Sequence, residues 1–102
     1  MDSVYIRETG SLIIYMPKEV DHHQAGMLRA QIDLLISMHH VRHLIFDFTD
    51  TEFMDSSGIG VLIGRYRNMN FSGGDVAACH LNARIDKIFS ASGLKKIIRI
   101  EA

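Results

Sequence analysis

The chain has 102 residues, 47% of them hydrophobic, which is enough for one folded domain and excludes an intrinsically disordered protein. Acidic and basic residues are interspersed and sum to a net charge of −1, which excludes the basic surface that binds nucleic acids or anionic membranes. The N-terminus lacks a signal-peptide pattern, and no apolar stretch reaches the about 18 residues needed to span a bilayer. We therefore expect a cytoplasmic protein with a single domain over residues 1–102.

A β-hairpin is predicted at the start of the chain. Apolar and polar residues alternate from Val4 to Arg7, and the run from Leu12 to Met16 has the composition of a second strand. The Thr9-Gly10 pair between them marks a turn. Pro17 ends the second strand because proline cannot donate a backbone hydrogen bond to a sheet.

The first helix is predicted to begin after Asp21, with Gln24 three residues later as its capping-box partner. Its buried stripe is formed by apolar residues at helical spacing: Ala25, Leu28, Ile32, Leu35 and Ile36. The strongly apolar run from Val41 to Phe48 then predicts a central strand, because strands buried on both faces lack alternation.

A second helix is predicted to begin near Ser57, followed by a buried strand from Val76 to His80 that contains the only cysteine, Cys79. Asn82 is expected to cap a third helix, and Gly93 to end it in a left-handed conformation. A last short strand is predicted over three isoleucines: Ile97, Ile98 and Ile100. The order ββαβαβαβ indicates an α/β fold with a mixed sheet of about five strands and at least three helices.

The most informative segment joins the central strand to the second helix, where an acidic loop ends in Asp55-Ser56-Ser57-Gly58. One interpretation is that the serines cap the helix and Gly58 permits a tight turn. The other is that one serine accepts a phosphate, because the N–H groups and the positive dipole end at a helix N-terminus favour a dianion. Three polar side chains stand where one cap would suffice, and this favours a phosphate acceptor beside an interface.

Enzymatic and ligand-binding alternatives find less support. The serines do not fit the Gly-x-Ser-x-Gly elbow of hydrolases, and the glycines at 58, 60 and 64 miss the dinucleotide fingerprint by one residue. The adjacent histidine pairs, His22-His23 and His39-His40, point about 100° apart on a helix, and the single Cys79 has no companion ligand. We therefore expect no catalytic residues, no cofactor and no metal. The glycines are interpreted instead as a smooth face that another backbone can approach.

One long segment and three shorter ones are distinctive in combination. The long segment runs from Phe53 to Tyr66, and the others are Val20–His23, Val41–Ile45 and Leu94–Arg99. Together they resemble the bacterial anti-sigma factor antagonists of the STAS fold, above all the sporulation type that opposes the anti-sigma-F factor. The resemblance covers almost the whole chain.

The resemblance implies a phosphorylation switch without catalysis by the chain itself. In this family the serine directly after the aspartate is the phosphoacceptor, which is Ser56 here. The unphosphorylated antagonist binds an anti-sigma factor, which is also the serine kinase, and so releases the sigma factor. The phosphorylated form cannot bind, and a metal-dependent protein serine phosphatase restores the active form. A STAS module of a general stress-response pathway is the first alternative, and a small nucleotide-binding protein is the second.

Within this interpretation, seven residues are expected to form the partner-binding surface: Asp21, His22, Asp55, Ser57, Gly58, Ile59 and Gly60. Asp55 is expected to orient the serine hydroxyl, and Ser57 to cap the second helix. The two glycines would admit the partner's backbone, and Ile59 would supply an apolar contact.

The chain departs from the family pattern in two places. Lys18-Glu19 stands where the family usually has Gly-Glu before the hydrophobic-Asp pair, which leaves the geometry of that corner open. Relatives also commonly carry a C-terminal helix after the last strand. The sequence stops at Ala102, so part of one sheet face is expected to be uncovered.

Overall fold

The protein is described by a computed structural model of residues 4–8 and 10–101. Its elements are, in chain order, β1 (Val4–Glu8), β2 (Ser11–Tyr15), β3 (Glu19–Val20), α1 (His22–His39), β4 (His43–Asp47), β5 (Phe53–Met54), α2 (Ser56–Phe71), β6 (Asp75–Cys79), α3 (Ala83–Ser92), the 3₁₀ turn η1 (Leu94–Lys96) and β7 (Arg99–Glu101). Within these residues, no helix is long and apolar enough to cross a membrane.

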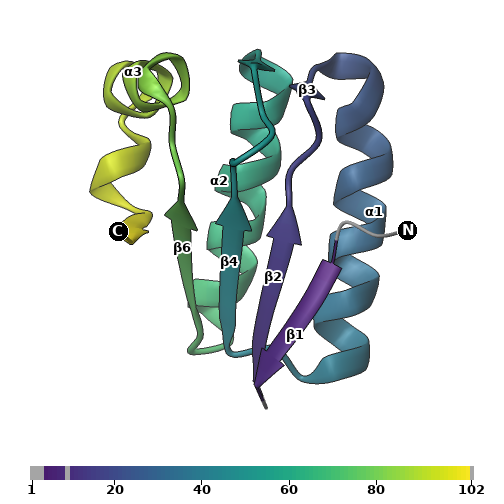
Figure 1. Cartoon of the computed structure of the whole chain (residues 1–102). Coiled ribbons are helices and arrows are strands. Elements are labelled where there is room, and N and C mark those ends of the chain that lie inside the picture. The colour runs from purple at the N-terminus through teal and green to yellow at the C-terminus, as the bar shows by residue number, and fades with distance from the viewer. Residues whose placement is uncertain (1–3, 9, 102) are drawn as a thin grey trace.

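The main sheet has five strands in the order β1-β2-β4-β6-β7, so the predicted central strand does lie at the centre (Figure 1). β1 pairs antiparallel with β2, whereas β2, β4, β6 and β7 are parallel to one another. The sheet is therefore mixed, as predicted. Gly10 forms the hairpin turn with φ +86°, a conformation that glycine adopts without strain, and Thr9 lies outside the described residues.

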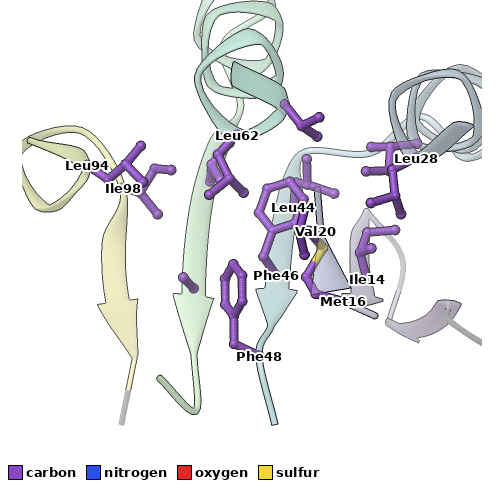
Figure 2. Packing of buried hydrophobic residues seen from close by; sticks show 14 of the residues in the cluster. Ile14, Met16, Val20, Leu28, Leu44, Phe46, Phe48, Leu62, Leu94 and Ile98 are labelled. Atoms are coloured by element: carbon purple, nitrogen blue, oxygen red, sulfur yellow. The ribbon is translucent and has the colours of Figure 1, made fainter. Parts of the chain in front are cut away.

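Helices α1 and α2 cover one face of the sheet, and the main core lies between these helices and the sheet (Figures 1 and 2). The stripe predicted for the first helix is confirmed at Ala25, Leu28 and Ile32, which are buried, while Leu35 and Ile36 are partly buried against the same core. Residues of the central strand such as Leu44 and Phe46 belong to this core and have no exposed surface.

A smaller cluster lies on the other face of the sheet, formed by Ile13, Ile45, Ala77 and Cys79. All four are at most 9% exposed, although α1 and α2 lie on the opposite face of the sheet (Figure 1). The expectation that part of a sheet face is uncovered stays a prediction, since the burial of these four residues concerns only the centre of this face. Cys79 ends β6 as a buried residue, as predicted.

Helix caps are the best-predicted local features. Asp21 Oδ1 accepts a hydrogen bond from the N–H of Gln24, and Asn82 Oδ1 accepts one from Ile85. Gly93 ends α3 with φ +81° in the left-handed region. These side chains satisfy N–H groups that a helix cannot pair internally, which is why the sequence signals them clearly.

Two parts of the prediction are wrong. The last strand begins at Arg99 instead of Ile97, because residues 94–96 form a 3₁₀ turn and Ile98 is buried against the core before the strand starts. The order ββαβαβαβ also omitted β3 and β5, which pair in parallel as a separate two-stranded sheet. β3 is the corner where the family glycine is absent.

Candidate functional site

The small sheet of β3 and β5 brings two helix N-termini together. Val20 and Met54 are register partners, and each lies just before the residue that caps the next helix. The N–H of Asp55 donates to the Val20 carbonyl oxygen at 3.2 Å. α1 and α2 therefore start side by side, at the end of the main sheet toward which β2, β4 and β6 point (Figure 1).

Asp55 connects the two helices. Its Oδ1 accepts hydrogen bonds from the N–H groups of Ser57 at 2.8 Å and Gly58 at 3.3 Å, and its Oδ2 accepts one from His22 at 3.2 Å. The carboxylate thus satisfies donors at both N-termini, where a negative charge is also favoured by the helix dipoles. Asp55 is a structural link as well as a neighbour of the candidate phosphoacceptor.

The prediction that Ser57 caps the second helix is wrong. The N-cap is Asp55, whose backbone is extended with φ −104° and ψ −170°, and Ser57 is already the second residue of α2. Asp and Ser are similarly good capping residues, so the sequence alone could not place the cap to within two residues.

Ser56 is exposed at the first position of α2. The three N–H groups that follow it in the chain are already bonded: those of Ser57 and Gly58 to the Asp55 carboxylate, and that of Ile59 to the Asp55 carbonyl oxygen. An anion on Ser56 would therefore be exposed to solvent beside the Asp55 charge, and would not occupy those N–H groups. This differs from the ready phosphate seat that the sequence suggested.

A groove of about 450 Å³ runs between the starts of α1 and α2. It is lined by residues of both helices: His22, His23, Ala25, Gly26, Arg29, Ser57 and Gly60. His22 Nδ1 lies 3.4 Å from Ser57 Oγ across it. Of the predicted surface residues, the groove joins His22, Ser57 and Gly60, and Asp21 caps the adjoining helix.

Arg29 is a groove residue that the sequence analysis did not identify. It follows His22 by seven positions, two helical turns, so both lie on the same side of α1. This seven-residue spacing is the feature of the sequence from which Arg29 could have been predicted to lie near His22. Arg29 places a positive charge on this wall of the groove, beside His22 and His23.

The glycines of α2 have different surroundings. A Cβ at Gly58 would lie 2.4 Å from Met54 Cγ and 2.9 Å from the Val20 carbonyl oxygen, so Gly58 is required for packing against β3 and β5. Its predicted exposure to a partner's backbone is wrong, because it is buried. Gly60 is exposed, and none of the described neighbours has an atom within 4 Å of a Cβ built there, whereas Ile59 is half-buried against the core.

Comparison with known proteins finds one matching family model and relatives with similar names. A family model described as "STAS domain" matches residues 3–102. An "anti-sigma F factor antagonist" of Paenibacillus polymyxa is 40% identical over 91 residues, which make up 89% of this chain and 78% of that protein. An "anti-sigma-B factor antagonist" of Bacillus subtilis is 32% identical over 84 residues, or 82% of this chain and 75% of that protein.

Solved structures agree with the fold. The anti-sigma factor antagonist SpoIIAA in its unphosphorylated form is 28% identical, with a TM-score of 0.85 over 97% of this chain and 86% of that chain. The phosphorylated form of the Bacillus protein SpoIIAA gives a TM-score of 0.77, also at 28% identity, over 97% of this chain and 89% of that chain. The prediction of an α/β domain of this type is confirmed.

Proposed function

Because this chain belongs to the STAS domain family, we propose that it is an anti-sigma factor antagonist whose binding is switched off by phosphorylation of Ser56. The observation that carries the proposal is the exposed Ser56 at the start of α2, which precedes the groove residue Ser57 in the chain. Relatives named as antagonists of two anti-sigma factors support the same role. The chain then acts through binding and has no catalytic residues of its own.

The proposed partner is an anti-sigma factor that is also a serine kinase. Its binding surface on this chain includes the groove, with His22, Ser57 and Gly60, and the exposed Ser56 that precedes Ser57. Gly60 leaves open space at its own position on the α2 wall of the groove, so a partner's backbone can approach there. A metal-dependent serine phosphatase would reverse the modification, and the whole cycle would take place in the cytoplasm, where sigma factors act.

The switch can be explained by local electrostatics. A phosphoserine carries a charge of about −1.5 to −2 and is much larger than a hydroxyl group. On Ser56 it would stand next to the Asp55 carboxylate, whose oxygens already accept three N–H groups. The added charge and bulk would therefore prevent a partner from packing closely, and the helix start would keep its hydrogen bonds. We expect a blocked surface and an unchanged fold.

The first test uses adjacent serines as a matched pair. The chain, Ser56→Ala and Ser57→Ala are incubated with ATP and the cognate anti-sigma factor, and the phosphate is located by mass spectrometry. We expect phosphate on Ser56 in the unmodified chain and in Ser57→Ala, and none in Ser56→Ala. Phosphate on Ser57, or undiminished phosphorylation of Ser56→Ala, would contradict the assignment.

The second test separates a blocked surface from a refolded chain. Ser56→Asp should keep the circular dichroism spectrum and urea midpoint of the parent chain, while its affinity for the anti-sigma factor falls by at least about tenfold, equivalent to 1.4 kcal/mol. Loss of the native spectrum would show that the modification acts through folding. Intrinsic hydrolysis of ATP by the chain alone would count against a non-enzymatic role.

The pathway has two candidates. The P. polymyxa relative opposes an anti-sigma F factor by its name, and the B. subtilis relative opposes an anti-sigma-B factor. The higher identity of the first, 40% against 32%, favours the sporulation type over the general stress type. Calorimetric titration of the chain with one anti-sigma factor of each type measures the preference, and we expect tighter binding to the anti-sigma F type.

A further inference from the structure

Three side chains with different metal-binding chemistry meet at the ends of β4 and β6. Asp47 and Cys79 are register partners on these neighbouring parallel strands, and His80 follows directly after β6. An Asp47 carboxylate oxygen, Cys79 Sγ and a ring nitrogen of His80 all lie within 4.8 Å of one another. Asp47 is 33 residues away from His80 in the chain, so no short sequence motif predicts that the three side chains meet.

Asp47 is held in a defined orientation. Its Oδ1 accepts hydrogen bonds from both the N–H and the hydroxyl group of Thr49, and its Oδ2 faces His80 Nδ1 at 3.0 Å. One carboxylate oxygen is thus fixed by neighbouring donors, as is common for carboxylates that ligate metals.

His80 is turned back toward the cluster by its backbone. Its φ of +59° lies in the left-handed region, which costs free energy in a residue other than glycine. The conformation places the ring nitrogen against Asp47, while 57% of the side chain remains exposed. The cluster thus has two buried members, Asp47 and Cys79, and a third that opens to solvent.

We propose that Asp47, Cys79 and His80 form a binding site for a divalent cation of the zinc class. Thiolate, imidazole and carboxylate are the three ligand types that zinc takes in proteins, and a solvent molecule can complete a tetrahedron on the exposed side. Ligand atoms around tetrahedral zinc are about 3.3–3.7 Å apart, so a separation of up to 4.8 Å closes with side-chain adjustments of about 1 Å. Carboxylate and thiolate together neutralise the two charges of the ion.

A second histidine–aspartate pair provides an internal comparison. His43 Nδ1 lies 3.0 Å from Asp75 Oδ1 at the opposite ends of the same two strands. Among the described residues, Asp47, Cys79 and His80 are the one group of three or more potential ligands, so the His43–Asp75 pair lacks a third member. If a histidine–aspartate pair alone sufficed, both ends of the strands would bind metal equally well.

The test is a metal titration of the whole chain after treatment with a chelator. Zn²⁺ binding is measured by calorimetry, and Co²⁺ binding by absorption, because a thiolate bound to Co²⁺ gives a charge-transfer band in the near ultraviolet. We expect one ion per chain and a thiolate band. Cys79→Ser should abolish the band and weaken Zn²⁺ binding at least tenfold, and His80→Ala should weaken it similarly. The control, His43→Ala, should bind as the parent chain does.

Binding that is unchanged in both Cys79→Ser and His80→Ala would overturn the proposal. So would binding that is lost only when the exposed pair His22 and His23 is replaced, since that would identify an adventitious surface site. His80 is largely exposed, so His80→Ala is expected to fold even if the buried Cys79→Ser does not, and circular dichroism monitors both. No anti-sigma factor takes part in the experiment, so its result is independent of the proposed switch.

Discussion

At the scale of single residues, Gly58 and Gly60 of α2 make a matched pair. A Cβ added at Gly58 would lie within 3.0 Å of Met54 Cγ, Val20 Cγ1 and the Val20 carbonyl oxygen, whereas none of the described neighbours lies within 4 Å of a Cβ at Gly60. Gly58→Ala should therefore destabilise the protein by about 1–3 kcal/mol through overpacking. Gly60→Ala should be neutral or stabilise it by up to about 1 kcal/mol, because alanine is the better helix former.

Urea unfolding followed by circular dichroism measures both variants, and the difference is expected in the midpoint and not in the slope. Equal midpoints for the two variants would show that β3 and β5 shift to accommodate the added methyl group without loss of stability. Close packing of Gly58 against β3 and β5 would then not be required for stability.

At the scale of elements, α1 and α2 are joined by an ion pair between Asp33 Oδ1 and Arg65 Nε at 3.0 Å. The Arg65 side chain is only 7% exposed. Burial lowers the pKa of its guanidinium group, and the charge of Asp33 acts in the opposite direction. Asp33→Asn should destabilise the protein by about 1–2 kcal/mol, because it leaves a buried charge without its counter-ion.

The control for this pair is Glu52, which pairs with Lys18 at 3.6 Å while both side chains are more than 60% exposed. Glu52→Gln should change the free energy of unfolding by less than about 1 kcal/mol, since solvent screens such pairs. If thermal unfolding gave equal losses for Asp33→Asn and Glu52→Gln, the contact between α1 and α2 would depend on apolar packing alone.

The helices and strands differ in how well they could be predicted from the sequence. The hairpin, three helices and central strands were predictable because each has a full period of apolar residues or a cap such as Asn82. β3 and β5 were not, because two residues cannot show a period of two. They form because the backbone carbonyl oxygen of Lys18 accepts hydrogen bonds from the N–H groups of Glu52 and Phe53, which are 34 or more residues away in the chain.

At the scale of the whole molecule, α3 is anchored to the core by Phe89. Its ring meets that of Phe48 edge to face, with centroids 5.5 Å apart and planes at 83°, and neither residue is exposed. Phe89→Ala should cost about 3–5 kcal/mol, a large part of the 5–15 kcal/mol that typically separates folded from unfolded domains. Phe71, at the end of α2, is 94% exposed, so Phe71→Ala should change stability by at most about 0.5 kcal/mol.

Thermal and urea unfolding of these two variants compare the same substitution at a buried position and at an exposed position. A loss for Phe71→Ala similar to that for Phe89→Ala would show that Phe71 is covered in solution, for instance by a second copy of the chain. Concentration dependence of the melting temperature would detect such an association.

The fold class, the strand and helix periods, most caps and the motif around Ser56 could be predicted from the amino-acid sequence, because all of these depend on residues close together in the chain. The folded structure shows in addition that Asp55, not Ser57, caps α2 and that Gly58 is packed internally. It also placed Cys79 beside Asp47 and His80, although the sequence analysis gave that cysteine no companion. The packing of Gly58 and the meeting of Asp47 with Cys79 depend on strand pairing, which brings distant residues into contact and which no short segment encodes. The cap at Asp55 is local, but Asp and Ser are similarly good capping residues, so the sequence could not choose between them.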